Sequence, residues 1–136
     1  MPYTDPSHQE ILDILGGVKV IALVGASENP ARASHGVMRF LQGKGYRVLP
    51  VNPGLAGQTL LGEPVFAALS DIAEPVDMVD IFRNSEAAGP IVDEAIALGV
   101  KVVWMQLGVV NHEAAERALA AGLRVVMDRC PAMELG

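Results

Sequence analysis

Three small residues at the end of an apolar run give this chain its clearest chemical signal. Gly25, Ala26 and Ser27 follow the branched segment Val20–Val24, and a helix-like segment begins soon afterwards. A strand that leads into a helix N-terminus has this pattern, and helix N-termini bind phosphate through unpaired N–H groups and partial positive charge. Gly25 allows close approach of the backbone to a ligand, and Ser27 adds a hydroxyl donor. The pattern predicts a nucleotide or cofactor site.

Composition limits the class of protein. With 136 residues, 51% of them hydrophobic, the chain is expected to form a single folded domain over residues 1–136. The net charge of −6 and the 4% aromatic content argue against nucleic-acid binding. There is no apolar run of the roughly 20 residues that would span a bilayer, and no signal-peptide pattern at the start. A single cysteine, Cys130, excludes an internal disulfide, and a cytoplasmic location is expected.

Hydrophobic periodicity indicates alternating strands and helices. Strands are expected at 18–24, 46–51, 76–82, 100–106 and 124–128, with a loop or short strand at 60–65. Helices are expected at 5–15, 33–43, 66–72, 85–98 and 111–121, with Ser85 and Asn111 as caps of the last two. This alternation predicts an α/β fold: a Rossmann-like, doubly wound, mostly parallel sheet of about five strands with helices on both faces.

The strand ends of such a sheet bring distant residues together. Ligands bind beyond the carboxyl ends of the strands, near the switch in strand order. The segments expected to share that edge are Gly25–Ser27, Asn52–Pro53, Phe82–Asn84, Gln106–Gly108 and Arg129–Pro131.

The loop departs from the dinucleotide fingerprint. That fingerprint requires a second glycine where this chain has Ser27 and a third where it has Pro30. The second expected strand is followed by Asn52 and has no acid at its end for a ribose, which weakens NAD as the ligand. Arg32 could supply positive charge for a phosphorylated ligand. An NAD(P)-binding enzyme or redox sensor on the same fold stays open as the alternative.

Five motifs together resemble a known family. They are Gly-Ala-Ser-x-x-Pro-x-Arg-x-Ser at 25–34, Gly-Tyr-x-Val-x-Pro-Val-Asn-Pro at 45–53, Val-Asp-x-Val-Asp-Ile-Phe-Arg at 76–83, Trp-x-Gln-x-Gly at 104–108 and Asp-Arg-Cys-Pro at 128–131. With them the chain resembles the small stand-alone CoA-binding proteins, which are similar to the N-terminal CoA-binding domain of the succinyl-CoA synthetase α subunit. The resemblance extends from about Ile11 to Met133.

The resemblance implies a ligand and a role for each motif. Coenzyme A or an acyl-CoA would bind noncovalently, and no catalytic residue or metal-ligand set is expected. The 136 residues offer no counterpart to the synthetase's second domain, so ligase activity is not expected to carry over, although a CoA-binding subunit of a larger acyl-CoA synthetase stays open. The implied contacts are Gly25, Ala26 and Ser27 with the pyrophosphate, Arg32 and Ser34 with phosphate, Asn52 and Pro53 with adenosine, Phe82 and Arg83 with the adenine or pantetheine side, and Gln106 and Gly108 at the floor.

Several side chains have two interpretations. Ser34 is expected more as the N-cap of its helix than as a phosphate contact. His35 is expected at the surface or next to a helix cap, and Trp104 in the core. Asp80 would be costly to bury unpaired, so it is expected to reach a strand end or a partner. Cys130 is either a small buried hydrophobe or a thiol close enough to the CoA thiol to form a mixed disulfide.

Overall fold

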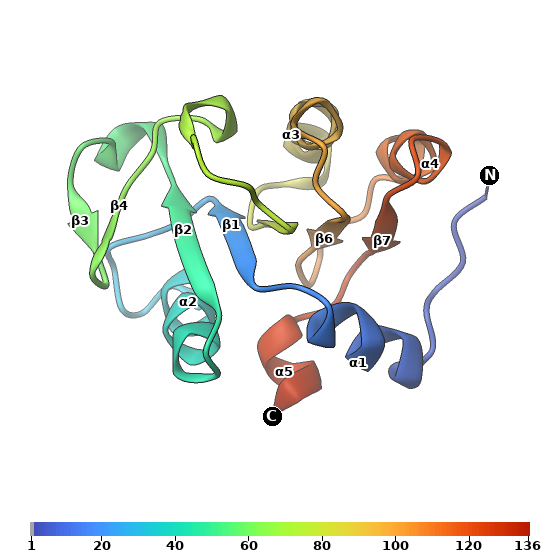
Figure 1. Cartoon of the computed structure of the whole chain (residues 1–136), viewed down its shortest axis with the longest axis horizontal. Helices are drawn as coiled ribbons and strands as arrows, with labels where there is room; N and C mark the ends of the chain where they lie inside the picture. The colour runs from blue at the N-terminus through green and yellow to red at the C-terminus, as the bar shows by residue number, and fades with distance from the viewer. Residues whose placement is uncertain (1) are drawn as a thin grey trace.

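A five-stranded sheet lies between two layers of helices in the computed structural model, which describes residues 2–136 (Figure 1). All neighbouring strands of this sheet are parallel, and their order is β2-β1-β5-β6-β7. The doubly wound, Rossmann-like prediction is therefore confirmed. The strands are β1 (Val20–Val24), β2 (Arg47–Val51), β5 (Met78–Ile81), β6 (Val102–Met105) and β7 (Arg124–Val126), and a separate antiparallel hairpin pairs β3 (Thr59–Leu60) with β4 (Glu63–Pro64).

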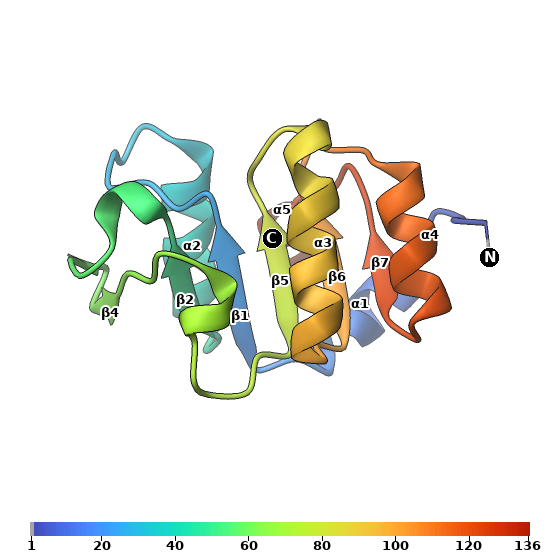
Figure 2. The ribbon, with the colours of Figure 1, turned by 90° about the horizontal axis from the view of Figure 1, so that it is seen from above.

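Helices cover both faces of the sheet. Figure 1 shows α1 (His8–Gly16), α2 (Ala33–Gly43) and α5 (Pro131–Leu135) below it, and Figure 2 shows α3 (Ser85–Leu98) and α4 (His112–Ala120) side by side over the other face. Two short 3-10 turns, η1 (Pro53–Leu55) and η2 (Leu69–Asp71), follow β2 and the hairpin. None of the helices within residues 2–136 combines the length and apolar character needed to cross a membrane.

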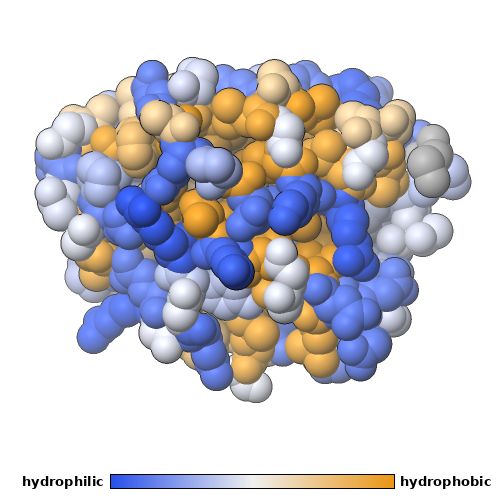
Figure 3. Space-filling model, in the orientation of Figure 1, coloured by the Kyte–Doolittle hydropathy of each residue, from blue (hydrophilic) through white to orange (hydrophobic). Residues whose placement is uncertain are grey.

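Alternation along β1 explains why this strand is central. Ile21 and Leu23 belong to the core cluster on the side of α1 and α2, whereas Ala22 and Val24 belong to the cluster on the side of α3 and α4. A parallel strand covered on both faces must be apolar throughout, and this one is. The space-filling view shows hydrophilic side chains spread over the outer surface, with hydrophobic surface visible between them (Figure 3).

Several expected boundaries were wrong. The first helix begins at His8 rather than at residue 5, because Ser7 and Glu10 form a capping box through two bonds of 3.2 Å. The third helix is capped by Asn84 rather than Ser85, since Asn84 Oδ1 accepts from the backbone of Ala87 at 2.8 Å. The helix expected at 66–72 is only the turn η2, and the short helix α5 was not foreseen.

Asp80 contradicts its expectation most strongly. It lies in β5, paired between Leu23 of β1 and Trp104 of β6, and is completely buried. Neither carboxyl oxygen has a hydrogen-bond partner among residues 2–136. Burial raises the pKa of this carboxyl well above its ordinary value, so the side chain is neutral where other carboxyls are charged. Trp104 is fully buried as predicted.

The strand order fixes where a ligand cleft forms. After β1 the chain adds β2 on one side and then crosses over to place β5 on the other side of β1. The segment that follows β1 leads to β2, whereas the segment that follows β5 leads to β6 on the opposite side. The chain therefore leaves the carboxyl ends of β1 and β5 in opposite directions. Between them a crevice opens at the edge of the sheet, the usual ligand position in this strand order.

Candidate functional site

A cleft of about 570 Å³ occupies the predicted switch point, within the range of small-molecule sites. Gly25 directly follows β1 and Phe82 directly follows β5, and the two backbones nearly touch there. A Cβ added to Gly25 would lie 2.6 Å from the Phe82 carbonyl oxygen, and the φ of Gly25 is +96°. Both facts require glycine at position 25.

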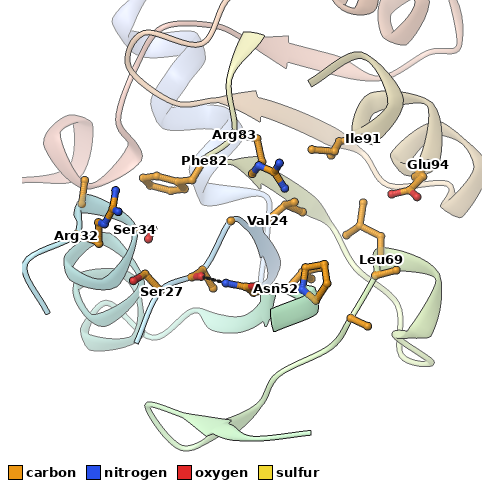
Figure 4. A pocket seen from close by; sticks show the side chains of 17 residues that line it. Val24, Ser27, Arg32, Ser34, Asn52, Leu69, Phe82, Arg83, Ile91 and Glu94 are labelled. Carbon is orange, nitrogen blue, oxygen red and sulfur yellow. Dashed lines mark hydrogen bonds between the residues drawn. The ribbon is translucent and has the colours of Figure 1, made fainter. Parts of the chain in front are cut away.

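Most of the predicted contact residues line this one cleft. Figure 4 shows Arg32, the residue before α2, and Ser34 of its first turn at one end, with Arg83 between Phe82 and Ile91. The predicted lining residues follow the carboxyl ends of β1, β2 and β5 or lie at the start of α2. This agrees with the expectation that ligands bind beyond the carboxyl ends of parallel strands. The predicted residues in the lining are Gly25, Ala26, Ser27, Arg32, Ser34, Asn52, Pro53, Phe82 and Arg83.

Hydrogen bonds from the end of β2 hold the small-residue loop. The N–H groups of Gly25 and Ala26 both donate to the Val51 carbonyl, at 3.0 and 3.3 Å. Asn52 Nδ2 donates to the Ala26 carbonyl at 2.7 Å, the dashed line in Figure 4. Asn52 Oδ1 accepts from the backbone N–H of Gly54 at 2.8 Å. This second bond orients the side-chain amide so that its nitrogen faces the loop. Asn52 is therefore a structural support of the loop as well as part of the cleft wall.

Beyond this support the loop leaves backbone donors free. Within residues 2–136, no protein acceptor pairs with the N–H groups of Ser27 and Glu28, or with those of Ala33 and Ser34 in the first turn of α2. Ser27 Oγ accepts from the backbone of Asn29 at 3.1 Å, so its own proton is available to a ligand. Unpaired N–H groups at a helix N-terminus, together with the helix dipole, favour an anion.

Positive charge lies at the same cleft. Arg32 and Arg83 are exposed, and neither guanidinium is paired with a carboxylate in the part of the chain that the structure describes. Ser34 is buried in the first turn of α2 and does not cap it, since Arg32 occupies the N-cap position without a side-chain bond. The preferred expectation for Ser34, a helix cap, was therefore wrong, because the helix starts before it.

The far end of the cleft was not foreseen. Its walls come from the segment before η2 and from α3, where Ile91 and Glu94 lie one turn apart (Figure 4). Ile91 and Glu94 are three residues apart and therefore lie on the same face of the helix. This spacing is the sequence signal that could have placed both residues at the cleft. The additional lining residues are Val24, Ala33, Val51, Ala67, Ala68, Leu69, Ile91 and Glu94.

The remaining predicted residues lie elsewhere. Gln106 and Gly108 are absent from the cleft lining because β6 lies one strand beyond the switch point. Gln106 is buried with its Oε1 unpartnered, and the N–H of Gly108 donates to Asp128 at 2.7 Å. Cys130 is buried in the core cluster on the α2 side and does not line the cleft.

His35 also lies where the sequence did not predict it. It is only 8% exposed, and its Nδ1 lies 2.9 Å from the Ser27 carbonyl oxygen. The expectation of a surface position was wrong, because the α2 face that carries His35 turns inward, under the loop. The alternative, a place next to the helix cap, is confirmed, since His35 lies in the first turn of α2, which Arg32 caps.

Comparison with known proteins agrees with the fold and the motifs. Residues 19–136 match the model of a family described as a CoA binding domain. The uncharacterized protein YneT of Bacillus subtilis (strain 168) is 39% identical over 126 residues, which are 93% of this chain and 92% of that protein. A solved Thermus thermophilus structure, cell-free ID.343, has a TM-score of 0.90 at 42% identity, covering 96% of this chain and 97% of its own.

A larger enzyme contains the same fold. The structure of a Ca. Korarchaeum cryptofilum dinucleotide-forming acetyl-coenzyme A synthetase 1, in complex with phosphate and ADP, matches 84% of this chain with a TM-score of 0.71 and 29% identity. The match covers 26% of that synthetase chain. The same architecture thus occurs in short chains and as a quarter of a long one.

Proposed function

We propose that this chain, which belongs to the CoA-binding domain family, binds coenzyme A or an acyl-CoA noncovalently in the cleft between β1 and β5, with residues 1–136 acting as one binding domain. The observation that carries the proposal is the set of unpaired donors at one end of the cleft. The backbone N–H groups of Ser27, Ala33 and Ser34 in the cleft lining, that of Glu28 next to Ser27, and the side chains of Arg32 and Arg83 lack protein acceptors within residues 2–136. Such a set suits the two adjacent phosphates of a CoA pyrophosphate.

The loop and the start of α2 would hold the pyrophosphate. The N–H groups of Ser27 and Glu28 would donate to one phosphate, and those of Ala33 and Ser34 to the other. Because Gly25 has no Cβ, the ligand and Phe82 can both lie close to the backbone at this point. Arg32 and Arg83 would add charge-assisted bonds, which are stronger than those between neutral groups.

The two organic ends of CoA would extend along the cleft walls. Asn52 and Pro53 would border the adenosine, next to the apolar wall formed by Leu69 and Ile91. Phe82 would contact the adenine or pantetheine side. Apolar walls with a few placed polar groups are typical of cofactor sites.

Calorimetric titration tests the proposal. The purified protein is titrated separately with CoA, dephospho-CoA, NAD and NADP, and saturable binding is expected for CoA but not for NAD. At a CoA concentration 100 times its dissociation constant, the folded state should gain about 2.7 kcal/mol in stability. Binding of NAD or NADP without CoA would instead support the alternative of a dinucleotide enzyme or sensor. Co-purification of a second chain would favour a subunit of a larger synthetase.

A pair of charge-neutralising variants locates the site. Arg32→Gln removes a guanidinium from the cleft, and Arg39→Gln removes one from the exposed surface of the same helix, outside the lining. Both lower the net charge equally. Arg32→Gln should weaken CoA binding about tenfold, in line with a charged hydrogen bond of about 1.5 kcal/mol, and Arg39→Gln should have little effect. Equal effects of the two variants would mean that only overall charge matters.

A further inference from the structure

One buried side chain outside the cleft contacts the loop that we propose as the phosphate site. His35 belongs to the first turn of α2, and its ring is almost fully enclosed. Its Nδ1 lies 2.9 Å from the Ser27 carbonyl oxygen. A carbonyl oxygen only accepts hydrogen bonds, so Nδ1 must carry the proton in this contact. The ring therefore acts as a fixed donor toward the loop.

This bond fixes the orientation of a peptide unit. The carbonyl of Ser27 and the N–H of Glu28 belong to the same planar, trans peptide, so they point in opposite directions. When His35 holds the carbonyl on its side, the Glu28 N–H is turned away from α2's interior face. Asn52 acts in the same way on the preceding peptide, because it holds the Ala26 carbonyl at 2.7 Å. The Ser27 N–H then points away from Asn52.

Beyond Ser27 the loop is supported only by hydrogen bonds between neighbouring residues. Ser27 Oγ bonds to the backbone of Asn29, Asn29 Oδ1 accepts from Ala31 at 3.0 Å, and the Asn29 carbonyl accepts from Arg32 at 3.0 Å. These bonds join neighbours two or three residues apart, and none of them connects the Ser27 carbonyl to another element. Among the bonds found within residues 2–136, the one from His35 is what ties the Ser27 carbonyl to the body of the protein.

We propose that His35 is a positioning residue, which holds the Ser27–Glu28 peptide so that its N–H is available to the pyrophosphate before the ligand arrives. The inference rests on the proposed CoA binding and adds a residue that does not line the cleft. Preorganised donors bind better than donors that must first rotate, since the ordering cost is already met in the free protein. His35 thus affects affinity without touching the ligand.

Three substitutions of His35 separate a donor from a space-filling ring. In His35→Asn, the side-chain amide nitrogen can occupy the place of Nδ1 and donate to Ser27. His35→Gln carries its amide one bond further, near the place of Nε2, and His35→Leu keeps an apolar side chain without any donor. Each variant is titrated with CoA and, as a probe without a pyrophosphate, with adenosine, after its melting temperature has been measured.

The expected result is a ranking. His35→Asn should bind CoA within about threefold of the wild type, whereas His35→Leu and His35→Gln should bind about tenfold more weakly or worse. Adenosine binding should be the same for all variants, because the adenosine end does not contact this peptide. If His35→Asn keeps its CoA affinity although its melting temperature is no higher than that of His35→Leu, the effect is one of positioning and not of general stabilisation.

Two results would overturn the inference. If His35→Leu binds CoA as tightly as the wild type, the loop needs no support from α2. If the Asn and Leu variants lose equal affinity, the ring merely fills space. Both leave the proposed function intact. A wild-type protein that binds no CoA would overturn the proposed function, and this inference with it.

Discussion

The buried carboxyl of Asp80 should make the protein less stable as the pH rises. Its side chain is completely enclosed, and both oxygens lack hydrogen-bond partners in the part of the chain that the structure describes. Burial raises its pKa well above the ordinary value of 3.8, so the folded protein keeps a proton that the unfolded chain loses. The contribution of this proton to the free energy of unfolding is fully present below pH 3.8. It is lost as the pH rises from there through the raised pKa of the folded state.

The size of the effect follows from a single proton. While the folded protein holds one proton more than the unfolded chain, each pH unit lowers the free energy of unfolding by about 1.4 kcal/mol. Asp80→Asn has nearly the same shape but cannot ionise, so it should lack this loss. The stability of Asp80→Asn relative to the wild type should therefore increase with pH.

Urea unfolding at several pH values, from about 4 to about 8, measures this difference. Subtracting the wild-type curve from the Asp80→Asn curve cancels the titration of the other groups. Asp80→Val should also be more stable than the wild type at neutral pH, by about 1–3 kcal/mol, since it removes an unsatisfied polar group. Parallel pH curves for the wild type and Asp80→Asn would refute the assignment of a neutral, unpaired Asp80.

Three further substitutions should have distinct effects. Gly25→Ala should cost about 1–3 kcal/mol in unfolding free energy and weaken CoA binding, because its Cβ would meet the Phe82 carbonyl; unchanged thermal unfolding would contradict this. Arg83→Gln should weaken CoA binding about tenfold by calorimetry and make the CoA affinity less dependent on salt concentration. Substitution of a surface charge away from the cleft should not have these effects. The Asp77 carboxylate is partly buried but accepts from the backbone of Val20 and Lys19 and faces Lys101, and these contacts lower its pKa. Asp77→Asn should therefore remove stability that the wild type has above pH 3.8 and loses in acid, so the two should converge in acid unfolding experiments.

The sheet edge was predictable because parallel strands place their carboxyl ends together. Gly25, Asn52 and Phe82 lie far apart in sequence, yet each follows a short apolar run, and this was enough to bring them to one cleft. The start of α1 was predicted wrongly, although Ser7 and Glu10 have the spacing of a capping box and the sequence therefore contained the signal for it.

Other features depended on packing that periodicity does not specify. Gln106 follows a strand just as Phe82 does, but the order of strands places β6 beyond the switch point. The inward position of His35 depends on how α2 is rotated about its axis. Asp80 was expected to avoid burial on energetic grounds, and the surrounding sheet encloses it nevertheless.

The central claim is that CoA's pyrophosphate binds the free backbone donors of the loop and α2. Titrating isotopically labelled protein with CoA, while following each backbone amide by two-dimensional NMR, tests this most directly. The largest chemical-shift changes are expected at the amides of Ser27, Glu28, Ala33 and Ser34. Large changes confined to other parts of the protein, with these four amides unmoved at saturation, would contradict it.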